Sequence, residues 1–167
     1  LAQSYADYIA APGDAPPAWL SSARGREVAT VALSRLAKRD PGRAQLLLER
    51  LPAPALDDAQ RGRVAYQVAL WTVASYLPGS ADRLNAVPPS AYDDRLHEWR
   101  TREAISRNDN AAALAAIGKM GEAQRGDSRW QYFEARLRER LGQSDAARAL
   151  YEKAAQSPSF HGWLAAD

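Results

Sequence analysis

The chain has 167 residues, of which 46% are apolar and 25% are charged, and it contains no Cys. This length and composition fit one folded domain with a sizeable core and exclude a disordered chain. The absence of Cys excludes disulfides and thiol chemistry. The 22 basic and 20 acidic residues alternate along the sequence and leave a net charge of only +2, so we expect a solvated helical surface and no nucleic-acid partner.

No run of the sequence approaches the ~18 apolar residues of a membrane span, so we expect none. The chain begins at Leu1, and Met120 is its only Met. We therefore expect a piece of a longer protein, in which the missing signal peptide carries no information about export.

Helix-forming residues run almost from end to end, broken by Pro and Gly at short intervals, and no segment alternates long enough to predict a strand. In chain order we expect helices over residues 1–10, 24–36, 41–51, 57–76, 92–107, 109–117, 129–141 and 144–156, and from 160 onward. The three glycines Gly118, Gly121 and Gly126 predict a loose connection rather than a helix.

Several breaks carry helix-start residues at a regular interval. Asp40 precedes Pro41, and we expect Asp40, Asn108 and Ser144 to be the N-caps of equivalent helices. The intervals are 68 residues, which is twice 34, and 36 residues. A leucine follows each expected cap by six residues: Leu46, Leu114 and Leu150.

An interval of ~34 residues is typical of tetratricopeptide repeats. The sequence therefore predicts an all-α fold of helix–turn–helix repeats stacked as a right-handed superhelix, forming a single segment over residues 1–167. The repeat between Asp40 and Asn108 is poorly matched, because Pro78–Ser80 lies near the expected turn but no leucine recurs. An irregular helical bundle remains the alternative.

Residue types that carry chemistry are few. His97 and His161 are far apart in sequence, and a zinc site needs three or four ligands, so we predict no metal site. The acidic pairs Asp57–Asp58 and Asp93–Asp94 are adjacent on predicted helices, where neighbours point about 100° apart and cannot clamp one bond. We interpret both pairs as helix-capping groups.

The common catalytic and nucleotide-binding motifs are absent. The sequence contains no Gly-x-Ser-x-Gly elbow, no P-loop and no Gly-x-Gly-x-x-Gly turn, so we predict no catalytic residue and no cofactor. It assigns no substrate-binding residue.

Aromatic residues are concentrated in the last third of the chain. Such rings stack on sugars in some proteins, and Arg can hold carboxylates, but at helical spacing we interpret the set as core. Its members are Trp99, Trp130, Tyr132, Phe133, Tyr151, Phe160 and Trp163.

Residues 128–167 resemble the superhelical region of soluble lytic murein transglycosylases. The resemblance rests on Trp-x-Tyr-x-x-Ala-Arg at Trp130–Arg136 and on the Phe-His-Gly-Trp-Leu-Ala-Ala run at Phe160–Ala166. Residues 98–102 and 107–109 look like the preceding repeat of that region, and weaker matches extend upstream.

This resemblance implies a periplasmic protein whose parent cleaves the β-1,4 bond between N-acetylmuramic acid and N-acetylglucosamine to a 1,6-anhydro product. In that family a separate lysozyme-like domain performs the reaction, and its Glu-Ser and Gly-Leu-Met-Gln signatures do not occur here. We therefore expect this chain to be a non-catalytic scaffold segment that contacts peptidoglycan glycan strands through the full-length protein. The alternative is a tetratricopeptide-type module that binds partner proteins.

Overall fold

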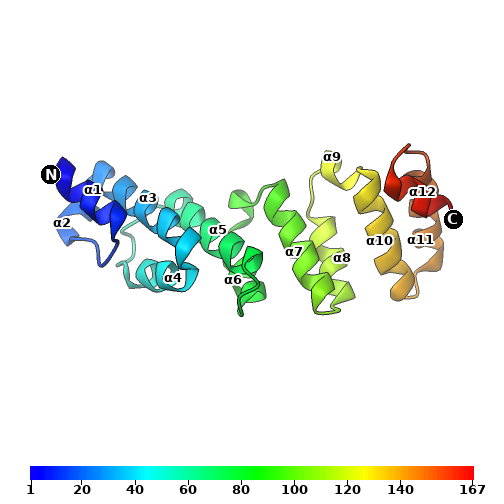
Figure 1. The fold of residues 1–167 in the computed structure, drawn as a ribbon, viewed down its shortest axis with the longest axis horizontal. Helices are drawn as coiled ribbons and strands as arrows, with labels where there is room; N and C mark the ends of the chain where they lie inside the picture. The colour runs from blue at the N-terminus through cyan, green and yellow to red at the C-terminus, as the bar shows by residue number, and fades with distance from the viewer. The chain divides into compact units, whose positions relative to one another are not determined.

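The computed structural model describes residues 1–167 and contains helices but no strand, which confirms the predicted all-α fold. The chain divides into two compact units, unit 1 (Leu1–Tyr92) and unit 2 (Asp93–Asp167) (Figure 1). No helix combines the length and the apolar character that crossing a lipid bilayer requires.

Unit 1 is built around α3, which packs against α4 and α5, while α5 also packs against α6 and η1. Its elements are α1 (Ala2–Ala10), α2 (Pro17–Leu20), α3 (Ala23–Arg39), α4 (Pro41–Arg50), α5 (Asp58–Ala74), α6 (Ser80–Ala86) and the 3₁₀ turn η1 (Pro89–Ala91). Helices α2 and α6, of four and seven residues, were not predicted, because neither segment shows a clear helical period of apolar residues.

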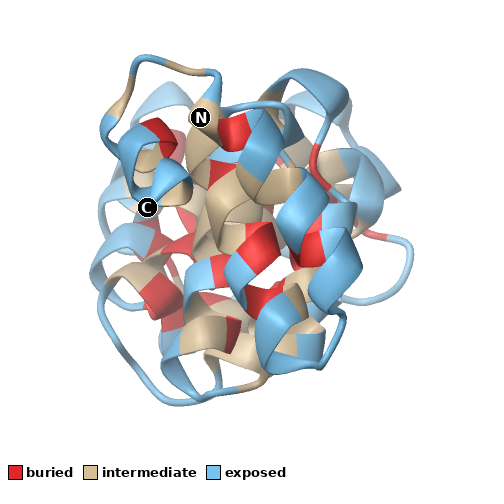
Figure 2. Cartoon of the chain, turned by 90° about the vertical axis from the view of Figure 1, so that its right-hand side faces the viewer, coloured by how far each residue is buried: buried red, intermediate tan, exposed pale blue.

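The core of unit 1 consists of the inward faces of α3, α4 and α5, together with the segment between α4 and α5. Figure 2 colours buried residues red, and in the helices nearest the viewer they alternate along each helix with exposed residues in pale blue. The larger buried side chains are Leu33, Leu36, Leu47, Leu48, Leu51, Leu56, Val64 and Val68.

Unit 2 contains the helix pairs α7–α8 and α10–α11, and α12 packs on both α10 and α11. Its elements are α7 (Asp94–Ser106), α8 (Asn110–Gly118), α9 (Glu122–Arg125), α10 (Ser128–Arg140), α11 (Ser144–Ala155) and α12 (Phe160–Ala166). The connection predicted from the three glycines contains the single turn α9, which no glycine interrupts internally.

The acidic pairs are capping groups, as predicted. The Asp57 carboxylate accepts a hydrogen bond from the backbone N–H of Gln60 at 2.7 Å, and the Gln60 side chain accepts one from the Asp57 N–H at 3.2 Å. This reciprocal arrangement is a capping box. Asp93 accepts from the backbone N–H of Leu96 at 2.9 Å, and Asp40 accepts from the N–H of Arg43 at the same distance.

Two of the expected N-caps are wrong by one residue. Asp109, not Asn108, caps α8 by accepting from the backbone N–H of Ala112. Helix α11 has Gln143 at its N-cap, with no side-chain cap bond. The turn between α10 and α11 explains this start. Gly142 adopts φ +75° there, a left-handed conformation that ends helices and that glycine favours. The Gln143 N–H then donates to the Arg138 carbonyl at 2.8 Å.

The repeat survives this correction, but its leucine position does not mark the core. The helices form four hairpins, whose second helices are α4, α6, α8 and α11. The N-caps of these second helices are Asp40, Gly79, Asp109 and Gln143, at intervals of 39, 30 and 34 residues. Leu46 is 48% exposed, while Leu114 and Leu150 are only half-buried. These helices instead bury Leu47, Ala113, Ile117, Ala147 and Ala154.

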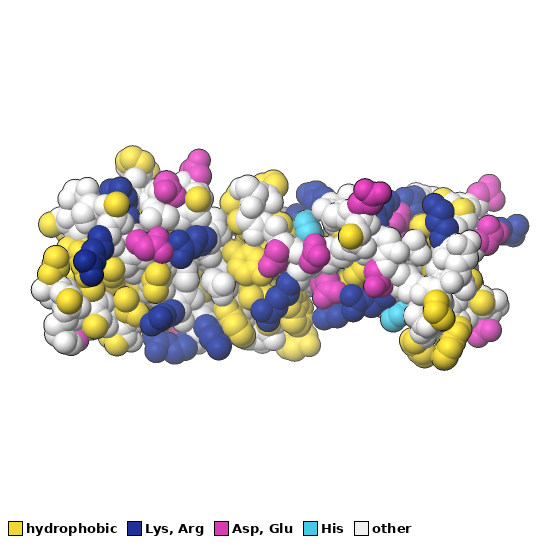
Figure 3. Space-filling view, turned by 90° about the horizontal axis from the view of Figure 1, so that it is seen from above, with side chains coloured by type: hydrophobic (Ala, Val, Ile, Leu, Met, Phe, Trp, Pro, Cys, Tyr) yellow, Lys and Arg dark blue, Asp and Glu magenta, His cyan; other side chains and the backbone are white.

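Charge is distributed differently in the two units. Unit 1 carries ten basic and eight acidic side chains and unit 2 carries twelve of each, so the net charge belongs to unit 1. On the face drawn in Figure 3, Lys and Arg side chains are interspersed with Asp and Glu side chains.

Candidate ligand pocket in unit 2

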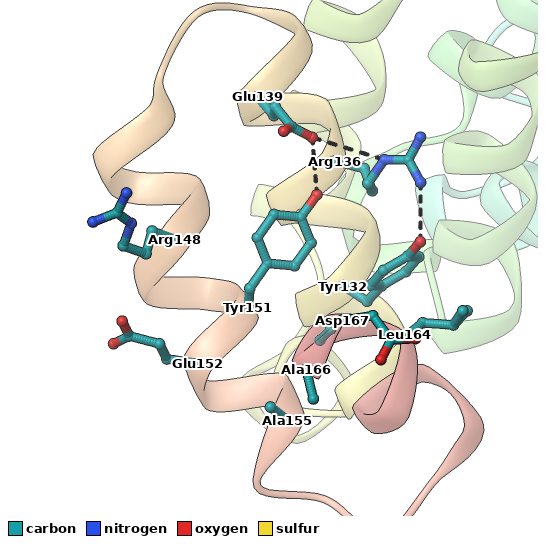
Figure 4. A pocket seen from close by; sticks show the side chains of 11 residues that line it. Tyr132, Arg136, Glu139, Arg148, Tyr151, Glu152, Ala155, Leu164, Ala166 and Asp167 are labelled. Atoms are coloured by element: carbon teal, nitrogen blue, oxygen red, sulfur yellow. Dashed lines mark hydrogen bonds and ion pairs between the residues drawn. The ribbon is translucent and has the colours of Figure 1, made fainter.

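Helices α10, α11 and α12 surround a pocket of about 780 Å³ that opens to solvent. Its wall combines two phenol rings, two guanidinium groups and three carboxylates, with apolar side chains from α12 (Figure 4). The lining residues that carry polar groups are Tyr132, Arg136, Glu139, Arg148, Tyr151, Glu152 and Asp167.

A hydrogen-bond network fixes the two tyrosines. Arg136 Nη1 donates to the Tyr132 hydroxyl at 3.0 Å, and the Tyr151 hydroxyl donates to Glu139 Oε2 at 3.1 Å. Arg136 Nε lies 3.9 Å from the same Glu139 oxygen, so one Arg–Glu pair connects both phenols. The Tyr132 and Tyr151 ring centroids are 5.9 Å apart, with the ring planes tilted by 59°.

These contacts set the protonation of the pocket. Partial burial, together with the hydrogen bond to the Glu139 carboxylate, raises the pKa of Tyr151 to about 12. The Tyr151 phenol therefore stays protonated at neutral pH and acts as a donor, not as a base. The hydrogen bond to Tyr132 raises the pKa of Arg136, which remains a cation.

Helix α10, which contributes three of these residues, is fixed by a buried carboxylate. Glu134 is 2% exposed and accepts from Arg125 Nη2 at 2.8 Å and from Arg138 Nη2 at 2.8 Å. Burial alone raises the pKa of Glu134, but the two guanidinium groups outweigh it and hold the pKa below its usual range. The carboxylate ties α9 to α10 and leaves the other face of α10 for the pocket.

Helix α12 consists of the sequence motif Phe160–Ala166, and side chains of this motif pack α12 against α10. His161 packs its ring against Tyr132 and Phe133, with centroid separations of 5.8 and 5.7 Å. The Ser128 and Ser159 hydroxyls, at the starts of the two helices, are 2.8 Å apart. The motifs at 130–136 and 160–166 thus form one structure, in which Tyr132 belongs both to the helix contact and to the pocket.

The aromatic residues predicted as core divide into three groups. Trp130 is 2% exposed and lies in the core, which confirms the prediction for this residue. Trp99, Tyr132, Phe133 and Tyr151 are half-buried. The prediction is wrong for Phe160 and Trp163, which are 65% and 67% exposed, because α12 buries only Gly162 against its neighbours.

The pocket offers donors, acceptors and ring faces, which are groups for binding a polar ligand with apolar faces. No group of three or more His, Cys, Asp or Glu side chains that could hold a metal is present. Sequence reasoning named Tyr132 and Tyr151 as aromatic residues but missed Glu139 and Arg136 as their partners. The Tyr132–Arg136 and Arg136–Glu139 contacts have i,i+4 and i,i+3 spacing and could have been found from the sequence. The Tyr151–Glu139 contact joins residues 12 apart and could not.

The fold and the pocket define an all-α protein of tetratricopeptide-like helical hairpins. Solved structures of lytic transglycosylases share this fold, and the chain is similar to a helical segment of Slt70, as the sequence resemblance predicted. No protein-family model matches the sequence, and no curated protein matches it.

Three solved structures illustrate the similarity. The 70 kDa soluble lytic transglycosylase Slt70 of Escherichia coli has a TM-score of 0.73 and 20% identity over 98% of this chain. An inactive mutant of the lytic transglycosylase Slt of Pseudomonas aeruginosa has a TM-score of 0.77 and 27% identity, also over 98%. A complex of the 70-kDa soluble lytic transglycosylase with bulgecin A has a TM-score of 0.72 and 21% identity over 95%.

The chain spans only about a quarter of the length of these proteins, between 25% and 27% of each solved chain.

Proposed function

We propose that this chain is a non-catalytic helical scaffold segment of a periplasmic lytic transglycosylase. The parent protein would cleave peptidoglycan between N-acetylmuramic acid and N-acetylglucosamine and leave a 1,6-anhydro end. The observation that carries this proposal is the similarity to Slt of Pseudomonas aeruginosa over 98% of the chain at 27% identity. The motifs at 130–136 and 160–166 support it independently, because they are carried by the sequence alone.

The side chains that this chain carries support a scaffold role for it, with catalysis elsewhere in the full-length protein. Glu139 already accepts a hydrogen bond from Tyr151 and faces Arg136, and the sequence lacks the Glu-Ser signature of the family's catalytic domain. We therefore assign no acid–base pair for glycosidic bond cleavage to the pocket. Residues 1–167 would therefore form one scaffold segment, and a catalytic domain elsewhere in the parent would perform the reaction. Holding a long strand in a fixed orientation lowers the entropic barrier at a distant active site.

The unit 2 pocket is the proposed contact with the glycan strand. Tyr132 and Tyr151 present ring faces that can stack on the apolar faces of sugars. Arg136 and Arg148 supply cations for the carboxylates that peptidoglycan carries on its stem peptides. The Arg136–Glu139 pair fixes the tyrosine hydroxyls before any ligand arrives, which reduces the ordering cost of binding.

Digestion of purified peptidoglycan by the full-length parent and by this chain tests the proposal, with products identified by mass spectrometry. We expect anhydro-muropeptides from the parent and none from the chain. If the parent releases none, the transglycosylase assignment is wrong, and the partner-binding alternative is favoured.

A pair of matched variants in the parent tests the role of the pocket. Tyr132→Leu removes a ring that lines the pocket, whereas Tyr76→Leu removes a ring that is 88% exposed in unit 1. We expect Tyr132→Leu to lower the rate on long glycan strands about tenfold with little effect on short muropeptides, as the loss of one stacking contact predicts. Equal rates for the two variants on long strands would show that the unit 2 pocket does not contact the glycan strand.

A further inference from the structure

Unit 1 contains a second pocket, of about 560 Å³, between α3, one face of α5 and η1. We propose that it binds an uncharged N-acetylated amino sugar. The inference rests on the proposed function for its ligand class, a saccharide, and adds a site and a sugar type. The lining side chains that carry the argument are Ser34, Asp58, Arg63, Tyr66, Gln67 and Ala91.

Arg63 is oriented by a partner that does not line the pocket. Its Nη1 donates to both carboxylate oxygens of Glu27, at 2.9 and 3.0 Å. This contact joins α5 to α3 and uses one nitrogen of the guanidinium group. The Nε and Nη2 groups remain as donors, and a guanidinium has five N–H donors in a fixed plane.

Gln67 is oriented in the same way. The indole N–H of Trp71, one turn further along α5, donates to Gln67 Oε1 at 3.0 Å. Because the carbonyl oxygen is engaged, the orientation of the side-chain amide is defined and its NH₂ group remains as a donor. Trp71 also lies under the Lys38 ammonium, which is 5.3 Å from a ring centroid of Trp71, so the indole has a second contact that fixes it.

A third polar group has no partner in the protein. The Ser34 hydroxyl oxygen is buried and makes no hydrogen bond, and it lines the same pocket. A buried polar atom without a partner costs free energy and is usually explained by a water molecule or a ligand. Ser34 therefore points to a polar ligand by an observation that is independent of the two oriented side chains.

The remaining wall fits a sugar ring. Tyr66 supplies an aromatic surface and Asp58 an acceptor for hydroxyl groups, while Ala91 supplies an apolar surface of methyl size. Asp58 and Arg63 carry opposite charges, so the lining has no net charge and does not select an ionised ligand. The Gln67 amide and the Ala91 methyl group line the same pocket, and together they offer a donor for the carbonyl oxygen and an apolar surface for the methyl group of an acetamido substituent.

The probe is N,N′,N″-triacetylchitotriose, which has acetamido groups and no charge, and the control ligand is cellotriose, which has hydroxyls in their place. Each is titrated into the isotope-labelled chain and followed by NMR, which detects weak binding. The reporter is the Trp71 indole N–H, assigned with the Trp71→Phe variant. We expect shifts of this signal and of α5 amides with triacetylchitotriose, and at least tenfold weaker binding of cellotriose.

Two variants and a matched control localise the site. Gln67→Leu removes the oriented amide and should weaken binding about tenfold, the value of one good hydrogen bond. Ala59→Phe places a ring in the mouth of the pocket from an exposed position on α5 and should abolish binding. Gln45→Leu changes the same residue type on α4, away from the pocket, and should leave binding unchanged.

The proposal is overturned if triacetylchitotriose shifts no α5 signal or if cellotriose binds equally well. It is also overturned if the Gln67→Leu and Ala59→Phe variants bind triacetylchitotriose as tightly as the unmodified chain does. Shifts confined to residues around Tyr132 would also overturn it while leaving the unit 2 pocket in place. Neither result depends on the products of peptidoglycan digestion, so a failure here is distinguishable from a failure of the proposed function.

Discussion

Glu134 and Gly162 are two residues whose importance follows from what lies within a few ångströms of them. Glu134 is a buried carboxylate between Arg125 and Arg138. Gly162 lies where α12 crosses the end of α11, and a methyl group there would be 2.8 Å from the Ala154 carbonyl oxygen and would overlap that of Ser157. Glu134 holds α9 against α10, and Gly162 lets α12 lie close to the end of α11, where both helices line the unit 2 pocket.

Replacing Glu134 by Gln should destabilise unit 2 by about 2 kcal/mol, the range for hydrogen bonds to charged groups. The cost stays moderate because Arg125 is 44% exposed and remains hydrated. Urea unfolding at pH 7 measures it. Glu152→Gln is the control, since no ion pair fixes Glu152, and it should change the free energy of unfolding by less than about 0.5 kcal/mol.

The same residue predicts a pH dependence. The pKa of Glu134 is lower in the folded chain than in the unfolded chain, so its contribution is complete above the ordinary carboxyl range and is lost as the pH falls through the lowered pKa. Between about pH 5 and pH 3 the unmodified chain should lose more stability than Glu134→Gln. Parallel curves for the two proteins would contradict the assignment.

Gly162→Ala should destabilise the docking of α12 by about 1–3 kcal/mol, the usual cost of forcing a methyl group into a filled space. Gly118→Ala is its control, because nothing lies within 4 Å of a methyl group there and Ala favours a helix over Gly. Thermal unfolding should show a lower Tm for Gly162→Ala only. A Gly162→Ala protein as stable as the control would show that α12 can shift without loss.

At the scale of elements, the helices of nine or more residues and the short helix α12 could be predicted, whereas α2, α6 and α9 could not. Asp40, Asp57 and Asp93 cap helices as predicted, because a capping bond reaches only three residues along the chain. Helix α6 and the turn α9 form where longer helices supply the contacts, α5 for α6 and α10 for α9. Local sequence carries little of that information.

Asp57→Ala should destabilise the start of α5 by about 1 kcal/mol, since it removes the hydrogen bond that the Asp57 carboxylate accepts from the Gln60 N–H. The neighbouring Asp58→Ala keeps the box and loses only a favourable interaction with the helix dipole, worth a few tenths of a kcal/mol. Amide hydrogen exchange in the first turn of α5 measures the difference. Equal exchange in the two variants would show that the capping box contributes nothing to α5.

At the scale of the whole molecule, each unit has a core of its own. The unit 1 core lies between α3, α4 and α5, and the unit 2 core surrounds Trp130 with Ala113, Ile117 and Met120. Compact units with separate cores usually fold alone. The division falls between Tyr92 and Asp93, directly before the capping residue of α7.

We therefore expect fragments 1–92 and 93–167 to be helical when each is expressed alone. Far-UV circular dichroism and cooperative urea unfolding of each fragment check this. An unfolded fragment would show that its core is insufficient in the absence of the other, and the chain would then be one cooperative structure.

The sequence by itself determined the all-α class, the repeat interval, the acidic helix starts and the resemblance carried by residues 128–167. All of these depend on residues close together in the chain or on the period of apolar positions. Only the tertiary structure decided which face of each helix is buried, so that Trp130 lies in the core while Trp163 is exposed. It also decided that Glu139 of α10 meets Tyr151 of α11, and that Glu27 of α3 meets Arg63 of α5. These contacts join positions 12 and 36 residues apart, and they depend on how helices pack, which no local pattern specifies.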